Sequence, residues 1–451
     1  MLWARFVAAS LLGGAAAVTA AGLYTDRKTS DLTLRMRASE ATRDASPLVI
    51  AENILPLKRT GVQSKGSSAL HKAIRASSPH TAPLIPYSHG ASYAIDIDFG
   101  GQTFEVVFDT GSSELWLAKT GVHCLYEDGS SAPLSACHFG PLAGSTFQDG
   151  RIADENLLTH YGDGEYVTGA LGYENVGIAN ITVQRQEVAL VSDGYWNGDG
   201  VASGLIGFAY PSLTRAYEGT NARADRKTTR LAPYNPWIFN AIAQNLTAPM
   251  FSLAIDRGPH GGGGQLALGG LPSVAFNHTF ASTPLKILDL DGLWSGARNY
   301  SQYAIVPDGF MLQGATRHHH ADNAKLTGND FPMIVDSGTT ALYLSTSVAA
   351  AVNAKYNPPA VVVDKDGMYG TACNAKPPSL AVRIGGSDFH ISGNDLRPVL
   401  ESKDPRTGKC LTPVQASKES FGILGDVFLK NVVAVFDIGA SEMRFAPRVD
   451  Y

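Results

Sequence analysis

The sequence predicts an all-β protein built from two similar lobes. Its 47 glycines separate short runs rich in Val, Ile, Tyr and Phe, a pattern typical of many short strands joined by turns. A motif centred on Asp109 recurs around Asp336, and 451 residues are enough to form two hydrophobic cores. The composition, with 44% hydrophobic and 17% charged residues, is typical of a globular protein. We therefore expect each copy of the motif to lie in its own lobe.

The first 80 residues differ in character from the rest of the chain. Arg5, an apolar stretch and the small residues at 18–20 predict a signal peptide over residues 1–20. Residues 1–80 contain 11 Lys and Arg against 5 Asp and Glu, whereas the remainder contains 25 against 36. We therefore predict that residues 21–80 form a basic propeptide, attracted to an acidic body until carboxylates are protonated. A leader that is merely solvated is the alternative.

Other features of the chain are typical of export. Neither a second long apolar stretch nor a hydrophobic C-terminal tail is present, so we expect no membrane anchor. The predicted location is extracellular, with an acidic vacuole as the alternative. Four sequons are candidate glycosylation sites: Asn180, Asn245, Asn277 and Asn299. Four cysteines allow three pairings. Proximity favours two local disulfides, Cys124 with Cys137 and Cys373 with Cys410. The spacing of the four cysteines does not match a zinc site.

The internal repeat is the most informative feature of the sequence. Residues 107–116 read Val-Phe-Asp-Thr-Gly-Ser-Ser-Glu-Leu-Trp, and residues 334–343 read Ile-Val-Asp-Ser-Gly-Thr-Thr-Ala-Leu-Tyr. Each copy is followed by Gly-x-x-Gly, at 204–207 and at 422–425. Two motifs repeated in the same order predict two homologous lobes, each contributing one carboxylate. We place the N-terminal lobe at 81–280 and the C-terminal lobe at 281–451.

These motifs resemble those of the pepsin-like aspartic proteases, particularly the secreted fungal enzymes. The resemblance is carried by Asp-Thr-Gly-Ser-Ser-x-Leu-Trp, the later Asp-Ser-Gly-Thr-Thr and the intervening Tyr-Gly-Asp-Gly, and it extends from about residue 85 to the end. It implies a bilobal pepsin-like fold with a deep cleft between the lobes. It also implies a monomeric aspartic endopeptidase, made as a zymogen, that hydrolyses extended polypeptides at acidic pH. Pepstatin-type inhibitors and the propeptide itself would block it.

The resemblance assigns roles to residues around the repeat. Asp109 and Asp336 would be the catalytic pair, sharing a proton because two adjacent carboxylates cannot both ionise cheaply. One carboxylate would act as general base toward a water while the other polarises the scissile carbonyl, with no metal, no cofactor and no acyl-enzyme. The residues that would support this pair are Thr110 and Ser337, which brace the loops, Ser112 and Thr339, which bond the carboxylates, and Gly111 and Gly338, which allow the tight turns.

The Tyr-Gly-Asp-Gly segment would be a hairpin lid, or flap, over the cleft. Tyr161 would cover the site, with its hydroxyl bonded to Trp116, while Gly162 and Asp163 would bond the substrate backbone as an added strand. The Asp163 charge favours tolerance of Lys or Arg beside the scissile bond, although Glu165 departs from the small hydroxyl residue common there. Leu205 corresponds to an apolar wall of the primary pocket, and simple core packing is the other interpretation.

Other functional classes fit the sequence less well. A non-catalytic pepsin-fold binding protein or decoy would usually lose an aspartate or its neighbouring hydroxyl, whereas both are complete here. A two-carboxylate glycosidase would not need two copies of Asp-hydroxyl-Gly. Neither the Gly-x-Ser-x-Gly elbow of serine hydrolases nor the His-Glu-x-x-His motif of metalloproteases occurs in the sequence. The acidic body argues against nucleic acid as a partner.

Overall fold

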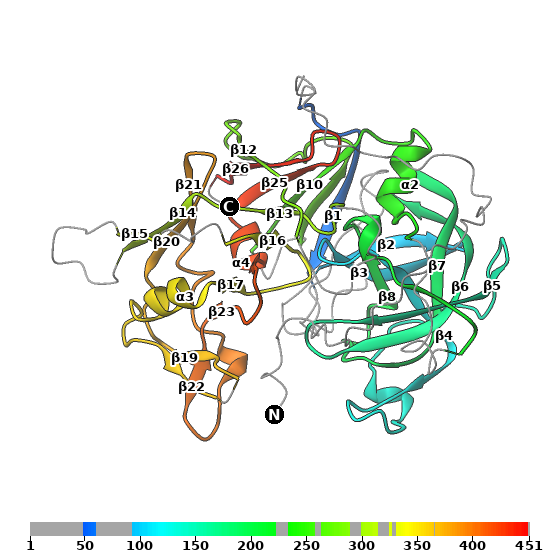
Figure 1. The fold of residues 1–451 in the computed structure, drawn as a ribbon, viewed down its shortest axis with the longest axis horizontal. Helices are drawn as coiled ribbons and strands as arrows, with labels where there is room; N and C mark the ends of the chain where they lie inside the picture. The colour runs from blue at the N-terminus through cyan, green and yellow to red at the C-terminus, as the bar shows by residue number, and fades with distance from the viewer. Residues whose placement is uncertain are drawn as a thin grey trace, which may run out of the picture.

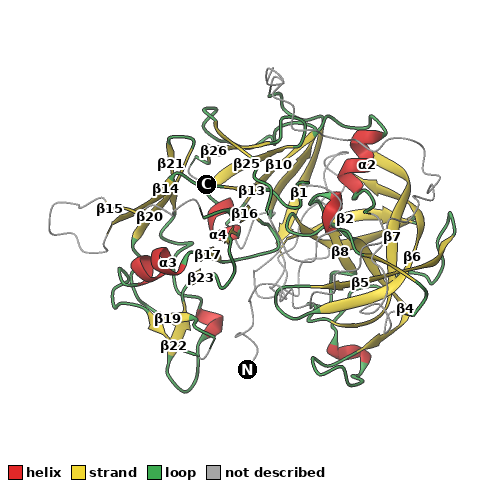
Figure 2. Ribbon diagram, in the orientation of Figure 1, coloured by secondary structure: helices red, strands yellow, loops and turns green. Residues whose placement is uncertain are grey.

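A computed structural model describes residues 48–59, 93–221, 233–257, 263–288, 299–313, 324–326, 331–364 and 366–449. The predicted signal peptide, and the predicted propeptide apart from 48–59, lie outside these residues. Strands are the main regular element of the described residues and helices are short (Figure 2). None of the helices in the described ranges is long and apolar enough to cross a membrane.

One large sheet contains fourteen strands in the order β12-β26-β25-β10-β11-β1-β2-β3-β8-β4-β7-β6-β5-β9. Its strands are β1 (Asn53–Arg59), β2 (Tyr93–Phe99), β3 (Gln102–Asp109), β4 (Leu115–Cys124), β5 (Arg151–His160), β6 (Tyr166–Ile178), β7 (Ile181–Tyr195), β8 (Gly204–Gly207), β9 (Ala216–Glu218), β10 (Met250–Ile255), β11 (Gly264–Leu268), β12 (Ala281–Pro284), β25 (Val432–Asp437) and β26 (Glu442–Pro447). The antiparallel pair β2–β3 forms a hairpin that leads into Asp109, the last residue of β3.

Three smaller sheets form the other lobe, in the orders β13-β16-β24-β17-β23, β15-β14-β20-β21 and β18-β19-β22. Their strands are β13 (Ala304–Ile305), β14 (Gly309–Gln313), β15 (Ala324–Leu326), β16 (Met333–Val335), β17 (Leu342–Leu344), β18 (Val361–Val362), β19 (Tyr369–Ala372), β20 (Ser379–Ile384), β21 (Ser387–Ile391), β22 (Lys409–Leu411), β23 (Val414–Ala416) and β24 (Gly422–Leu424). In the described residues, the helices are α2 (Trp237–Ala243), α3 (Thr346–Asn353) and α4 (Asp426–Leu429), with short 3-10 turns at Leu134–Ala136, Pro211–Leu213 and Leu400–Ser402.

The molecule has two β-rich lobes on either side of shared strands (Figure 1). Strands β2 to β8 lie on one side, and β14 to β23 lie on the other. Between them stand β10, β25 and β26. Strand β10 comes from the segment predicted as the N-terminal lobe, and β25 and β26 come from that predicted as the C-terminal lobe. The all-β, bilobal fold predicted from the repeat is thus the observed one.

The repeated glycines hold each aspartate loop against a neighbouring strand. Strand β8 runs parallel to β3 and pairs Gly207 with Asp109, and β24 runs parallel to β16, which ends beside Asp336. A side chain at Gly207 would collide with the Ser112 backbone, and one at Gly425 would collide with the Thr339 backbone. The Gly-x-x-Gly echo therefore reflects close backbone packing beneath both loops.

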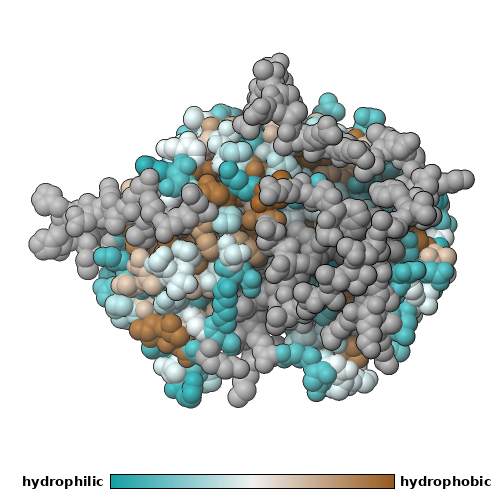
Figure 3. All heavy atoms as spheres, viewed as in Figure 1, coloured by the Kyte–Doolittle hydropathy of each residue, from teal (hydrophilic) through white to brown (hydrophobic). Residues whose placement is uncertain are grey.

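The hydrophobic core continues through both lobes and the strands between them. The rings of Phe251 on β10 and Phe436 on β25 stack with centroids 4.4 Å apart, and Phe251 also contacts Phe108 beside the first aspartate. Hydrophilic residues are spread over both lobes on the face in Figure 3, with hydrophobic residues in small groups. The apolar side chains of the strands are thus mostly turned inward, as alternation along a half-buried strand requires.

Strand β1, within the predicted propeptide, is built into the large sheet. Residues 53–57 pair antiparallel with β11, and residues 58–59 pair with β2. Leu55 and Leu57 are fully buried. In this form of the chain, β1 thus connects the shared strands to those of the first lobe.

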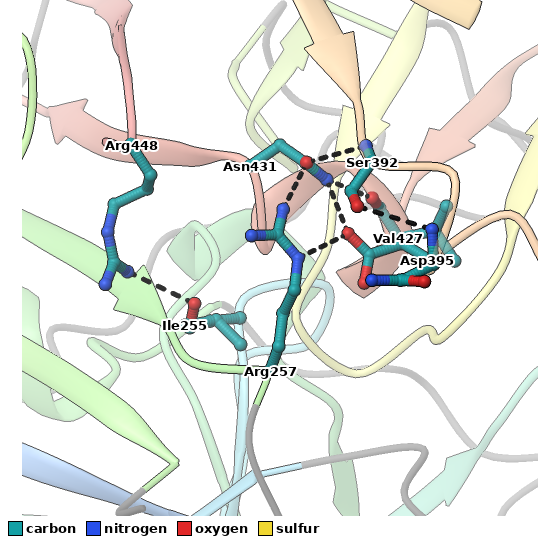
Figure 4. Close-up of polar contacts among 8 residues, drawn as sticks. Ile255, Arg257, Ser392, Asp395, Val427, Asn431 and Arg448 are labelled. Atoms are coloured by element: carbon teal, nitrogen blue, oxygen red, sulfur yellow. Dashed lines mark hydrogen bonds and ion pairs between the residues drawn. The ribbon is translucent and has the colours of Figure 1, made fainter. Parts of the chain in front are cut away.

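A polar network fastens the end of β10 to the second lobe (Figure 4). Arg257 bonds Asp395 through Nε at 2.8 Å and also bonds the Asn431 side chain. Asn431 in turn donates to Asp395 at 3.0 Å and to the Val427 carbonyl at 2.8 Å, and it accepts from the backbone of Ser392 at 2.9 Å. Since Arg257 lies 138 and 174 residues from Asp395 and Asn431, its bonds fix this lobe on the shared strands.

Both predicted disulfide pairings are confirmed. Cys124 is bonded to Cys137 in the first lobe, and Cys373 is bonded to Cys410 in the second. Each closes a local loop, of 13 and 37 residues in sequence separation, so neither disulfide crosses between the lobes.

Candidate active site

The two repeated aspartates occupy matching positions at the junction of the lobes. Asp109 is the last residue of β3 and Asp336 follows β16, and their exposed fractions are 7% and 8%. The backbone N–H of Gly111 donates to Asp109 Oδ1 at 2.7 Å, and that of Gly338 donates to Asp336 Oδ1 at 2.8 Å. Each loop therefore turns back on its own carboxylate in the same way.

Hydroxyl groups hold the second oxygen of each carboxylate. Ser112 Oγ donates to Asp109 Oδ2, and Thr339 Oγ1 donates to Asp336 Oδ2 at 2.6 Å. With both oxygens of each aspartate bonded, neither side chain is free to rotate. The carboxylates are thereby fixed in position before any substrate arrives.

The two carboxyl groups lie against each other and are hydrogen-bonded. Burial raises the pKa of Asp109 well above its usual value, and the charge of Asp336 and the bond to it raise the pKa further. The bonds from Ser112 and Gly111 act in the opposite direction but do not cancel these effects. The pair therefore retains a shared proton at pH values where an isolated aspartate would be ionised.

The aspartate pair leaves no room for a side chain at Gly111 or Gly338. A Cβ atom at Gly111 would lie 2.6 Å from Asp336 Oδ1, and one at Gly338 would lie 2.5 Å from Asp109 Oδ1. Each glycine thus faces the carboxylate of the opposite lobe. The Asp-hydroxyl-Gly order is required because the carboxylates must approach each other across these two positions.

Thr110 and Ser337 join the two loops through reciprocal, buried hydrogen bonds. Thr110 Oγ1 donates to the Val335 carbonyl at 3.0 Å and accepts from the Ser337 N–H at 3.0 Å. Ser337 Oγ donates to the Phe108 carbonyl at 3.2 Å and accepts from the Thr110 N–H at 3.2 Å. Four bonds between lobes therefore set the distance between the aspartates.

The Tyr-Gly-Asp-Gly segment forms the turn of the β5–β6 hairpin, whose last pair before the turn is His160 with Tyr166. Gly164 N–H donates to the Tyr161 carbonyl at 3.1 Å, which closes the turn. Trp116 Nε1 donates to the Tyr161 hydroxyl at 2.7 Å, the contact expected from the sequence. Burial, followed by the nearby charge of Glu114, raises the pKa of Tyr161, so this hydroxyl stays protonated.

Comparison with known proteins decides the family. Residues 92–448 match the family model described as eukaryotic aspartyl protease. The chain belongs to the eukaryotic aspartyl proteases. It is 36% identical to a probable aspartic-type endopeptidase of Aspergillus fumigatus, over 97% of each chain. It is 27% identical to rhizopuspepsin of Rhizopus chinensis, over 90% of this chain and 94% of that one.

A solved structure shows the same fold at greater distance. The crystal structure of an aspartic proteinase from Irpex lacteus matches the protease with a TM-score of 0.57 and 18% identity. The match covers 81% of this chain and 96% of the other. The bilobal pepsin-like architecture is therefore shared although most residues differ.

The structure adds residues to the site that the sequence did not single out. Trp196, after β7, makes edge contacts with the rings of Trp116 at 4.9 Å and Tyr161 at 5.7 Å between centroids. Gln302, from the second half of the chain, donates to the Gly111 carbonyl at 3.1 Å. No local motif marks either residue, because each reaches the site only through packing of distant segments.

The remaining sequence predictions fall on the surface, in the core or outside the described residues. Gly162 is exposed at the flap tip, whereas Leu205 is only 3% exposed and packs with Val107 and Trp116 in the core beneath the flap. This position agrees with the core-packing interpretation of Leu205. All four sequon asparagines are exposed: Asn180, Asn245, Asn277 and Asn299.

Proposed function

We propose that this protease is a secreted endopeptidase that hydrolyses extended polypeptides at acidic pH through one water held by Asp109 and Asp336. The observation that carries the proposal is the hydrogen-bonded pair of buried carboxyls, in which the pKa of Asp109 is raised. Such a pair contains one group able to accept a proton and one able to donate a proton. Both are required to add water to a peptide bond.

The chemistry follows from that single shared proton. The ionised carboxylate takes a proton from the water as its oxygen bonds to the scissile carbonyl carbon, and the protonated partner gives its proton to the carbonyl oxygen. The proton taken from the water then passes to the nitrogen as the carbon–nitrogen bond breaks. One hydroxyl on the same carbon returns its proton to the partner carboxylate as the new carboxylic acid forms. Both products leave, and the pair is again singly protonated. No atom of the protein becomes covalently bonded to the substrate.

The flap supports an extended substrate. The exposed backbone at Gly162 and the turn around Asp163 lie at the end of a long antiparallel hairpin, so a peptide can add to it as a further strand. Tyr161, held by Trp116, would cover the bound peptide and exclude water from the carboxyl pair. We expect the enzyme to act as a monomer and to bind pepstatin-type inhibitors in the same place.

We further propose that the protease is made as a zymogen, with a signal peptide at 1–20 and a propeptide at 21–80. The basic composition of this leader and its strand β1 in the large sheet support an intramolecular inhibitory role. The lobes proper would then span 81–280 and 281–451. Four exposed sequons and two disulfides support passage through an oxidising secretory pathway. Retention in an acidic vacuole is the alternative destination.

The test is hydrolysis of denatured haemoglobin by acid-treated protein from about pH 2.5 to about pH 7, which spans the usual range of carboxyl groups. Asp109→Asn, Asp336→Asn and added pepstatin should each abolish activity that peaks below about pH 5. Asp128→Asn is the matched control, because Asp128 is exposed in the first lobe and should not affect cleavage. Activity that survives both aspartate variants would refute the mechanism. A folded, leader-free protein without activity would favour a non-catalytic binding protein instead.

A further inference from the structure

Glu165 is a buried carboxyl group at the base of the flap turn. It lies directly before β6, and only 5% of its surface is exposed. Burying a carboxylate without a compensating partner costs several kcal/mol, so such a residue is retained only where it is bonded or protonated. The burial of the Glu165 side chain therefore needs a physical explanation, and its position in a surface hairpin does not supply one.

The contacts of Glu165 connect the flap turn to the segment that follows β7. The backbone N–H of Asn197, just after β7, donates to Glu165 Oε1 at 2.6 Å. The backbone N–H of Glu165 donates to Asp163 Oδ1 at 3.0 Å, and the two side-chain carboxyls are hydrogen-bonded to each other. A bond between two carboxyls requires a proton on one of them.

The surroundings of the pair favour that protonated state. Burial raises the pKa of both residues, and the adjacent charge of Asp163 raises the pKa of Glu165 further, well above its usual value. Ionisable groups that face the pair include Tyr161, beside the charge of Glu165, and Tyr343, beside the charge of Asp163. A proton shared between the two carboxyls relieves the repulsion between them.

We propose that Glu165 is a positioning residue of the flap, which with Asp163 forms a second one-proton carboxyl pair that fastens the flap turn to the backbone of Asn197. The inference rests on the proposed peptidase function, since the flap matters only if it covers a substrate. Asn197 follows Trp196, whose ring contacts both Tyr161 and Trp116. The pair therefore fixes the loop that supports the covering tyrosine.

The proposal makes the flap sensitive to pH independently of the catalytic aspartates. The proton is present at pH values below the raised pKa of Glu165 and is lost as the pH rises through it. Two buried carboxylates would then repel each other, and the turn would separate from Asn197. The closed flap is thus stable in acid, where the catalytic pair is also singly protonated, and loosens toward neutral pH.

Kinetics of two substitutions test the positioning role. Glu165→Gln keeps a donor for Asp163 and an acceptor for Asn197, whereas Glu165→Ala removes both. We expect Glu165→Ala to raise KM about tenfold or more, with a smaller change in kcat, and Glu165→Gln to restore most of the loss. Glu218→Gln is the matched control, an exposed glutamate on β9 of the same sheet. Equal KM values in all four proteins would overturn the proposal.

A readout that needs no activity separates this inference from the proposed function. Tryptophan fluorescence is measured from about pH 3 to about pH 8 in the Asp336→Asn background, which removes the catalytic carboxyl pair. The Trp196→Phe variant shows which part of the fluorescence change comes from Trp196. We expect a transition above the usual carboxyl range that disappears in Glu165→Gln. Its persistence in Glu165→Gln would refute the second pair even if peptidase activity is found. The transition without peptidase activity would support the pair and refute the function.

Discussion

Replacing Thr110 by Val tests whether the four bonds between the loops hold the active site together. Valine fills nearly the same volume but removes one hydroxyl, which bonds the Val335 carbonyl and the Ser337 N–H at 3.0 Å each. Thr110 is fully buried, so no water can replace the lost bonds. Two buried polar groups left unpaired, at about 1–3 kcal/mol each, predict a loss of about 2–6 kcal/mol in unfolding free energy.

The assay combines guanidinium unfolding with cleavage kinetics. Unfolding is measured in the Asp336→Asn background to prevent self-digestion, and Ser252→Ala serves as control because Ser252 is a buried hydroxyl bonded to the Gly270 carbonyl. Both substitutions should destabilise the fold, but only Thr110→Val should also lower kcat, by about tenfold or more, since it displaces the carboxylates. Wild-type stability together with wild-type kcat in Thr110→Val would show that these bonds do not set the site geometry.

Three further predictions follow from the same structure. Because the pKa of Asp109 is higher in the folded state, proton binding at Asp109 stabilises the fold. This contribution is fully present below the unfolded-state pKa, about 4, and is lost as the pH rises through the folded-state pKa. The melting temperature should therefore fall with rising pH in this range, and less steeply in Asp336→Asn; identical slopes would contradict this. Gly338→Ala should reduce kcat/KM about a hundredfold or more, because its Cβ would meet Asp109. Gly393→Ala should not, because its Cβ would make only an ordinary contact with Pro377 at 3.9 Å. Asn431→Ala should lower the unfolding free energy by about 2–4 kcal/mol in urea titrations without changing KM; an unchanged midpoint would show that its network adds no stability.

The sequence predicts those features whose physics is local. Asp109 and Asp336 stand in short motifs whose glycines and hydroxyls bond the carboxylate two or three residues away. The disulfides join cysteines 13 and 37 residues apart, so proximity alone selects the pairing. The flap is a hairpin with a recognisable turn, and its tyrosine meets Trp116 as the resemblance implies.

Contacts made by distant segments could not be predicted in this way. Asn197 reaches Glu165 because β6 and β7 pair along their length, and no motif includes both residues. The bonds of Arg257 to Asp395 and Asn431 span 138 and 174 residues. Such contacts depend on how sheets pack, which composition and periodicity do not specify. The departure at Glu165 was visible in the sequence, but its partners were not.

The reciprocal bonds between Thr110 and Ser337 make the centre of the protease an isologous contact within one chain. Each loop donates a hydroxyl hydrogen bond to the equivalent carbonyl of the other, Thr110 to Val335 and Ser337 to Phe108. Identical subunits make equivalent contacts of this kind across a two-fold axis. A peptide has no such symmetry, because its amino and carboxyl directions differ. Direction must therefore be set by parts that occur once, and the hairpin with Tyr161 comes from the first half alone. Under the proposed function, the symmetric core would supply the carboxyl groups, and the flap would determine the direction in which a peptide binds.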